Sequence, residues 1–225
     1  MSIPVPSSAR AAELRSAVLG LLAVSALVAC GPRPDAIREA HSAPVGTGLT
    51  VEGYVTVPPG AFESSLGNPG FALQDDSGGV WVKTATKLDF ALGQQVRVKG
   101  VVGEEAQMRL VDTASGSAEK LSGTAQVAPR DVSTHDVGEA TEGRLIRVKG
   151  HVSRGFEDDS PYGYKLYVDD GTGEIQIYVN TGTGLTAARL QALTVGQAVE
   201  VVGLSSQYES TYEVDPRQPS DLTVE

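Results

Sequence analysis

From about residue 49 onward the chain is written in short runs in which apolar and polar residues alternate. In the runs at 71–74 and 80–83 the larger apolar side chains recur at every second position, which is the period of a strand with one face in a core. The Asp- and Gly-rich turn at 75–79 joins these two runs, as is typical of a β-hairpin. The pattern therefore predicts an all-β chain.

The same order of runs occurs twice along the chain. The corresponding segments, first unit and then second, are 49–55 and 146–152, 71–82 and 166–177, 92–100 and 195–203, and 108–111 and 212–214. The longest additional piece in the second unit is 181–193, in which residues 187–190 predict a short helix. An internal repeat of this kind indicates two similar structural units.

Each unit, with five strands and a hairpin between the second and third, resembles an OB-fold, the five-stranded Greek-key barrel. The segments that carry the resemblance are DDSGGVWV, DDGTGEIQI, LGQQVRVKG, VGQAVEVVG, EGRLIRVKGHV and DPRQPSDL. More narrowly, they resemble OB-fold domains of exported bacterial proteins, some of which accompany secreted nucleases. The resemblance implies two tandem OB-fold-like barrels at 47–132 and 143–225, with a join at 133–142. A β-sandwich of about ten strands has similar strand signals and remains the alternative.

The first thirty residues carry a targeting pattern. Arg10 and Arg15 precede an apolar run at 17–29, which is shorter than the roughly 20 residues that a membrane-spanning helix needs. A basic start followed by a short apolar run is typical of a secretory signal peptide. The run ends in Leu-Val-Ala-Cys, which resembles a bacterial lipobox, and Cys30 is the only cysteine of the chain.

We therefore expect residues 1–29 to be a signal peptide and Cys30 to be lipidated after export, with an ordinary secretory signal as the alternative. By the same resemblance, Gly31 favours sorting to the outer membrane. The polar, Pro-rich residues 30–46 predict a tether between the lipid and the fold. The predicted location is a bacterial envelope membrane, with the membrane as a partner through the lipid.

The charge balance narrows the possible ligands. The chain has 18 basic and 28 acidic residues, for a net charge of −10. A protein that binds nucleic acid by neutralising phosphates needs clustered positive charge, so nucleic acid is disfavoured. A local basic stripe at Arg144, Arg147, Lys149 and Lys165 keeps nucleic acid among the possible ligands.

Metal, cofactor and catalytic sites find no support in the sequence. One Cys and three His exclude a disulfide framework and leave little room for a metal site. The acidic clusters at 75–76, 157–159 and 169–170 lack the spacing of a calcium loop, and turn geometry explains Asp beside Gly. No nucleophile turn or phosphate-binding loop occurs. We expect no metal, no cofactor and no enzymatic activity.

Alternation assigns each strand residue to the inside or the outside of its barrel. The inward set is Phe71, Leu73, Val80, Val82, Leu166, Val168, Ile175 and Ile177. The outward set is Glu52, Tyr54, Ala72, Gln74, Trp81, Lys83, Lys149, His151, Tyr167, Asp169, Gln176 and Tyr178. Within it, the candidate ligand-binding residues are Tyr54, Trp81, Lys83, Lys149, His151, Tyr167 and Tyr178.

Outward aromatic side chains can stack on bases or on sugar rings. The sequence therefore predicts a non-catalytic binding module for an oligomeric ligand: a glycan, an extended peptide or a single-stranded nucleic acid. One alternative is an envelope interaction protein whose aromatic residues pack the barrels on a partner or on one another. A further alternative, an accessory to a secreted nuclease, follows from the resemblance alone.

Overall fold

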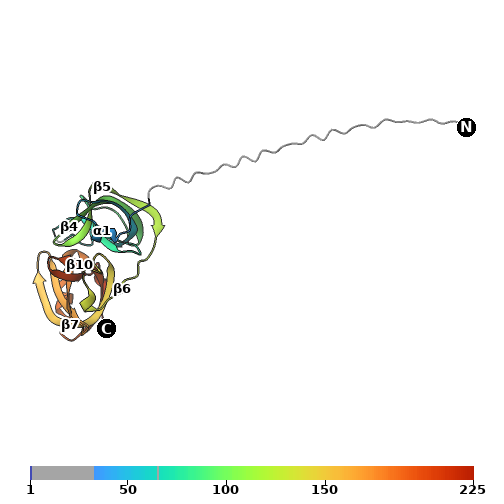
Figure 1. Ribbon diagram of the computed structural model, residues 1–225. Helices are drawn as coiled ribbons and strands as arrows, with labels where there is room; N and C mark the ends of the chain where they lie inside the picture. The colour runs from blue at the N-terminus through green and yellow to red at the C-terminus, as the bar shows by residue number, and fades with distance from the viewer. Residues whose placement is uncertain (2–32, 65) are drawn as a thin grey trace. The chain divides into compact units, whose positions relative to one another are not determined.

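The computed structural model describes residues 1, 33–64 and 66–225 (Figure 1). Residues 2–29 of the predicted signal peptide and Cys30 lie outside the described residues. Within the described part of the chain, no helix is long and apolar enough to cross a membrane. Residues 34–225 form one compact unit, and all that follows concerns this unit.

The first half of this unit is a closed five-stranded barrel, called barrel 1. Its strands are β1 (Gly48–Val57), β2 (Gly70–Gln74), β3 (Gly79–Lys83), β4 (Gln94–Glu105) and β5 (Met108–Thr124). They pair in the order β1-β2-β3-β5-β4, and β1 closes the barrel on β4. Only the β3–β5 pairing is parallel, so the fifth strand inserts beside the third, as in the expected Greek key.

The second half repeats this order and is called barrel 2. Its strands are β7 (Leu145–Asp159), β8 (Gly163–Asp169), β9 (Glu174–Asn180), β10 (Ala198–Tyr208) and β11 (Thr211–Asp215). They pair as β7-β8-β9-β11-β10, and β10 closes on β7. The prediction of two tandem OB-fold-like barrels is confirmed by this strand order, and two separately closed barrels are incompatible with the β-sandwich alternative.

Short elements complete barrel 2. The strands β6 (Arg130–Asp131) and β12 (Leu222–Val224) pair with β7 and β10, and the 3-10 helices are η1 (Thr134–Asp136), η2 (Thr181–Thr183) and η3 (Pro219–Asp221). The helix α2 (Ala187–Gln191) lies between β9 and β10, where the sequence predicts one. The Thr186 side chain accepts a hydrogen bond from the Arg189 N–H and caps its start, as N-cap threonines do.

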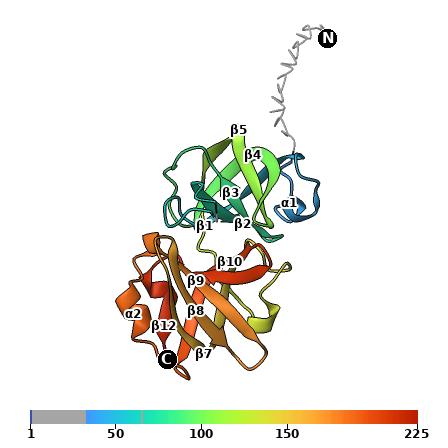
Figure 2. The ribbon, with the colours of Figure 1, turned by 90° about the vertical axis from the view of Figure 1, so that its left-hand side faces the viewer.

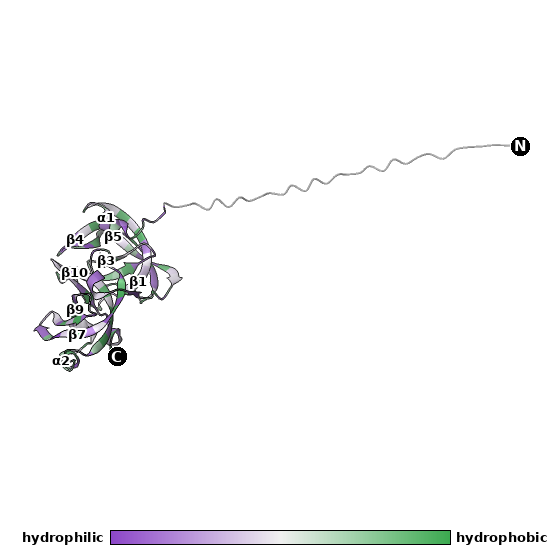
Figure 3. Cartoon of the chain, turned by 60° about the horizontal axis from the view of Figure 1, so that its bottom comes forward, coloured by the Kyte–Doolittle hydropathy of each residue, from purple (hydrophilic) through white to green (hydrophobic). Residues whose placement is uncertain are grey.

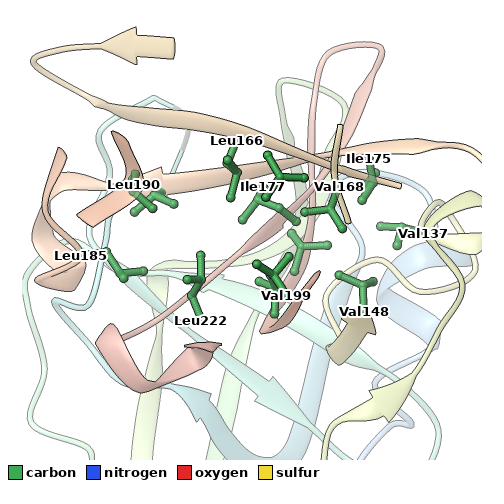
Figure 4. Packing of buried hydrophobic residues seen from close by; sticks show 14 of the residues in the cluster. Val137, Val148, Leu166, Val168, Ile175, Ile177, Leu185, Leu190, Val199 and Leu222 are labelled. Atoms are coloured by element: carbon green, nitrogen blue, oxygen red, sulfur yellow. The ribbon is translucent and has the colours of Figure 1, made fainter. Parts of the chain in front are cut away.

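Each barrel has its own apolar core, and the predicted inward residues all lie in these cores. In barrel 2, Leu166, Val168 and Ile177 point toward Val199 from the opposite wall (Figure 4). Hydrophobic and hydrophilic segments alternate along the strands (Figure 3), as expected for strands whose two faces see different surroundings.

The segment that precedes β1 differs from its prediction. Residues 34–46 were expected to belong to a tether, and this is wrong. Asp35 pairs with the edge of β1, where its N–H donates to the Thr50 carbonyl at 2.7 Å. The single-turn helix α1 (Glu39–Ser42) follows, and Ile37 and Ala40 are fully buried in the core of barrel 1. Two apolar residues three positions apart fill one face of a helical turn, a signal too short to distinguish in a Pro-rich segment.

Candidate functional site

The outer face of barrel 1 is occupied by barrel 2. Seven side chains form a shared apolar cluster, called the inter-barrel cluster: Val57, Phe62, Ala72, Trp81, Met108 and Leu110 of barrel 1 and Leu204 of barrel 2. Trp81 is 2% exposed and stacks on Phe62, with ring centroids 5.5 Å apart and an interplanar angle of 8°. In Figure 2, β10, which carries Leu204, lies where the two barrels meet.

The prediction that Trp81 is an exposed ligand platform is therefore wrong. The alternation was interpreted correctly, because Trp81 points away from the core of its own barrel. The second barrel, however, takes the place of water on that side. The alternative stated from sequence, an aromatic residue that packs the barrels together, describes Trp81.

Polar contacts and one close backbone approach also stabilise the interface between the two barrels. The Arg217 guanidinium of barrel 2 donates to the Thr56 carbonyl of barrel 1 at 2.9 Å and is itself held by Asp221 at 2.7 Å. A Cβ added to Gly79 would lie 2.0 Å from the Gly143 carbonyl oxygen, so only glycine fits there. The barrels are thus packed against each other by backbone as well as by side chains.

A histidine and a buried carboxylate add a charged contact at this interface. His41 Nε2 lies 2.7 Å from the Gly79 carbonyl, and His41 Nδ1 lies 3.4 Å from Glu142 Oε1. Glu142 also accepts a hydrogen bond from the Arg109 N–H at 2.9 Å. Burial acts to lower the pKa of His41, but the Glu142 carboxylate and the Gly79 carbonyl outweigh it and hold this pKa above its ordinary value.

The other candidates in barrel 1 are dispersed. Lys83 forms ion pairs with Glu105 at 2.7 Å and with Asp112 at 3.6 Å, so its charge is engaged within the barrel. Tyr54 is half-buried and lines a groove of about 500 Å³ between β1, β2 and residues 125–128. A second groove of about 650 Å³ is lined by residues of both barrels and by residues 125–127.

In barrel 2, Lys149 and His151 are exposed on the first half of β7. The Lys149 ammonium forms ion pairs with Glu200 at 2.8 Å and with Glu225 at 3.2 Å. Both residues lie on the part of β7 that pairs with β10. Lys149 therefore lies outside the part of β7 that pairs with β8, whereas His151 lies opposite Asp169 of β8.

Tyr167 and Tyr178 belong to a network that the structure assembles on the outside of barrel 2. We call it the tyrosine–carboxylate face, and its members are Arg154, Glu157, Asp159, Lys165, Tyr167, Gln176, Tyr178 and Glu213. They come from β7, β8, β9 and β11. These strands are neighbours in the sheet, in the order β7-β8-β9-β11, and alternation turns the network members of β8, β9 and β11 away from the core.

Hydrogen bonds link the members across the strands. The Tyr167 hydroxyl donates to Glu157 Oε2 at 3.1 Å, and the Tyr178 hydroxyl donates to Asp159 Oδ2 at 3.1 Å. The Gln176 amide donates to Glu213 Oε2 at 2.6 Å. Each tyrosine hydroxyl and the glutamine amide is thus oriented by a carboxylate on another strand, which is the adjacent strand for Tyr167 and Gln176 and lies beyond β8 for Tyr178.

Two cations lie within this acidic surrounding. The Arg154 guanidinium lies 3.4 Å above the centre of the Tyr167 ring, a cation–π arrangement, and it pairs with Glu174 at 2.7 Å. Lys165 Nζ lies 3.4 Å from Asp159 Oδ1. Tyr167 is only 8% exposed as a result, so the prediction of a freely accessible ring is wrong for Tyr167, whereas Tyr178 is half-buried.

The pKa values of the face reflect burial. Burial and the Asp159 carboxylate both raise the pKa of Tyr178. Burial raises the pKa of Glu213 to about 7, against the opposing effect of the hydrogen bond from Gln176. Burial also raises the pKa of Asp215 well above its ordinary value, and the charge of Glu213 adds to this effect. Ionisable groups perturbed in this way concentrate at functional sites.

Sequence reasoning did not connect Arg154, Lys165, Glu157 and Glu213 with this face, and it did not single out the neighbouring Asp215. The alternation rule, applied to residues 212–216, would have placed Val214 inside and the two flanking acids outside. Their burial, at 6% and 5% exposure, could not have been found this way, because it depends on groups outside their own strand.

Two of the three acidic clusters, at 75–76 and 169–170, behave as turn residues. Asp75 Oδ1 accepts hydrogen bonds from the Ser77 N–H at 2.7 Å and the Gly78 N–H at 2.8 Å. Asp170 Oδ1 similarly accepts from Thr172, and this bonding lowers the pKa of Asp170. Within residues 33–64 and 66–225, no group of three or more His, Cys, Asp or Glu side chains is arranged to hold a metal ion.

No family model matches this chain, and no curated protein matches it. Among solved structures it is similar to an OBody, AM1L10, bound to hen egg-white lysozyme, at 19% identity over 44% of this chain and 98% of that one, with a TM-score of 0.35. It is also similar to a murine DNA-binding protein bound with double-stranded DNA, at 10% identity over 74% and 90%, with a TM-score of 0.41. A third is the tetrameric p202 HIN2, at 14% identity over 80% and 92%, with a TM-score of 0.35. The fold assignment rests on the strand order, not on these likenesses.

Proposed function

We propose that this protein is a non-catalytic, lipid-anchored binding protein of a bacterial envelope, and that its ligand surface is the tyrosine–carboxylate face of barrel 2. The observation that carries the proposal is the network of oriented hydroxyl, amide and carboxylate groups on four neighbouring strands. The middle of this strand surface is where OB-folds take oligomeric ligands.

The chemistry of the face favours a neutral oligosaccharide. Carboxylates, an amide and two cations provide acceptors and donors side by side, and such groups match the alternating roles of sugar hydroxyls. The half-exposed Tyr178 adds an aromatic surface next to Lys165 and Asp159. A polyanion such as nucleic acid would meet the carboxylates of Glu157, Asp159 and Glu174 and would be repelled.

The binding test compares two matched variants in the full chain. Replacing Asp159 by Asn together with Lys165 by Gln removes one acceptor and one cation from the face while keeping side-chain size. Lys149→Gln, on the other half of β7, is the control. An array of neutral oligosaccharides identifies the best probe, and calorimetry with that probe measures affinity. The double variant should lose about tenfold or more in affinity, and the control should lose none.

Two outcomes contradict this proposal. One is equal affinity of the double variant and the wild-type protein for the selected oligosaccharide. The other is tighter binding of a single-stranded oligonucleotide, with an affinity that falls steeply between roughly 50 and 300 mM salt, as phosphate contacts require.

The anchor is a separate part of the proposal. The lipobox-like end of the apolar run and the single cysteine support lipidation at Cys30. Because Asp35 is already paired with β1, only residues 31–34 would separate the lipidated residue from the fixed fold. Cys30→Ser should abolish fatty-acid labelling and detergent partitioning of the mature protein. Equal labelling of the variant and the wild-type protein would refute the lipid anchor but not the proposed ligand surface.

A further inference from the structure

The two sides of the barrel contact differ in chemistry. Barrel 1 contributes six of the apolar side chains of the inter-barrel cluster, and barrel 2 contributes Leu204 alone. Next to Leu204, barrel 2 presents polar groups: the Ser206 hydroxyl lies 3.5 Å from Met108 Sδ. An aromatic, apolar face is thus covered by a largely polar one.

Two carboxylic acids lie on the barrel 2 side of this contact. Val214 points into the core of barrel 2, so its neighbours Glu213 and Asp215 point outward. They lie across the strand pair from Ser206 and Leu204, the residues that contact barrel 1. Both acids are at least nine-tenths buried, and side chains outside their own barrel core can be this buried only beneath other groups.

Polar atoms at the contact are incompletely matched. Asp215 Oδ1 is buried without a hydrogen-bond partner, and so is Trp81 Nε1 in the inter-barrel cluster. Other buried atoms without a partner in the described residues are Thr56 Oγ1, Glu142 Oε2 and Arg109 Nη1, on segments that tie the two barrels. Each unmatched buried group costs free energy relative to a solvated one, so these atoms oppose closure of the contact.

The turns that touch across the contact are strained. Ala106 and Gln107 in the β4–β5 turn have φ values of 47° and 71°, and Glu209 in the β10–β11 turn has a φ of 52°. Non-glycine residues rarely adopt such angles, and their cost must be balanced by contacts elsewhere. The Glu209 N–H donates to the Ala106 carbonyl at 2.6 Å, so the two strained turns hold each other.

We propose that this contact is a proton-linked latch, in which Glu213 and Asp215 keep barrel 2 over the Phe62–Trp81 pair while they are protonated and release it when they ionise. Release exposes the stacked aromatic pair to solvent. The latch adds a conformational device to a fold whose proposed ligand surface lies mainly on the other strands of barrel 2.

The surrounding groups fix the direction of the effect. Glu213 is faced by Asp159 of β7, Lys165 of β8, Gln176 and Tyr178 of β9, Asp215 of β11 and Ser206 of β10. On the barrel 1 side, Met108 and Trp81 do not titrate, and Glu105 of the same hairpin is paired with Lys83. Two other ionisable contacts lie at the interface, His41 with Glu142 and Arg217 with Asp221.

The sign follows from linkage. A carboxyl group whose pKa is raised in the closed state binds more protons there, so closure is favoured at low pH and is lost as pH rises through the closed-state value. With the pKa of Glu213 raised to about 7 by burial, the closed-to-open ratio should fall as pH rises through about 7. The raised pKa of His41 acts in the same direction, because its ion pair is also lost as pH rises.

Trp81 is the only tryptophan of the chain and reports directly on the latch. Its emission maximum and its quenching by acrylamide are measured in the full chain between about pH 4.5 and 8.5, with far-ultraviolet circular dichroism as the check that the barrels stay folded. We expect a shift to longer wavelength and stronger quenching, centred near neutral pH, with no loss of β-structure.

Four variants isolate the effect of the two acids. Glu213→Gln with Asp215→Asn should keep Trp81 shielded at every pH. The matched pair Glu63→Gln with Asp89→Asn, on exposed positions of barrel 1, should behave as the wild-type protein does. His41→Gln should retain the transition, and if the double acid variant folds poorly, Glu213→Gln alone should move the transition to higher pH.

The proposal is overturned if Trp81 stays equally shielded across the pH range in the folded wild-type protein. It is also overturned if the acid variants keep the wild-type transition, or if His41→Gln alone abolishes it.

Discussion

Barrel 1 and barrel 2 have the same strand order and the same alternation of inward and outward side chains. Their outward side chains nevertheless differ in burial. In barrel 1 the outward Ala72 and Trp81 are buried in the inter-barrel cluster. In barrel 2 the corresponding strands carry the tyrosine–carboxylate face, whose Tyr178 and Lys165 remain half-exposed. The period of a strand therefore tells which way a side chain points, whereas what lies on that side depends on the rest of the fold.

The largest effect should come from removing the side chain that fills the inter-barrel cluster. Trp81→Ala should lower the free energy of unfolding by about 4 kcal/mol, because it leaves a cavity beneath Phe62 and Leu204. Urea unfolding followed by circular dichroism measures it. A loss below about 1 kcal/mol would mean that Trp81 is in contact with water and that the two outer faces are alike.

A backbone test sharpens the same comparison. Gly79→Ala places a methyl group against the Gly143 carbonyl and should cost about 2–3 kcal/mol, since the two backbones must separate. Gly48→Ala is the matched control, because a Cβ at that position meets nothing within 4 Å. Equal unfolding midpoints for the two variants would contradict the packing of the barrels described above.

The smallest effect on stability is expected on the face of barrel 2. Tyr178→Phe removes the hydroxyl that donates to Asp159 and should cost about 0.5–1 kcal/mol, while it weakens oligosaccharide binding. A loss as large as that of Trp81→Ala would assign Tyr178 to a buried structural role and would remove it from the ligand surface.

The fold was accessible from the sequence because its signals are local. The Asp/Gly turns, the period-2 runs and the repeat of their order predicted two five-stranded barrels. The short helix predicted at residues 187–190 is also present, and Thr186 caps its start. The N-terminal segment could not be predicted, because Ala40 in the single-turn helix α1 and Ile37 just before it are buried only by contact with barrel 1.

The site was only partly accessible for a related reason. Tyr167, Gln176 and Tyr178 were placed on the outside of barrel 2 by alternation, and there they lie. The burial of Trp81 beneath Leu204 and the burial of Glu213 both depend on an interface between segments that are far apart in the sequence. No pattern within one strand reports such an interface.

The central claim is that Trp81 on the outer face of barrel 1 is covered while Tyr178 on the outer face of barrel 2 is accessible to solvent, and hydroxyl-radical footprinting with mass spectrometry tests both in one experiment. Tyr162, at 73% exposure, is the reference for full reactivity in the same chain. The account predicts that at mildly acidic pH Trp81 is unmodified despite its high intrinsic reactivity, while Tyr178 is modified and becomes protected on adding the selected oligosaccharide. Modification of Trp81 as fast as that of Tyr162 in the folded protein would contradict it.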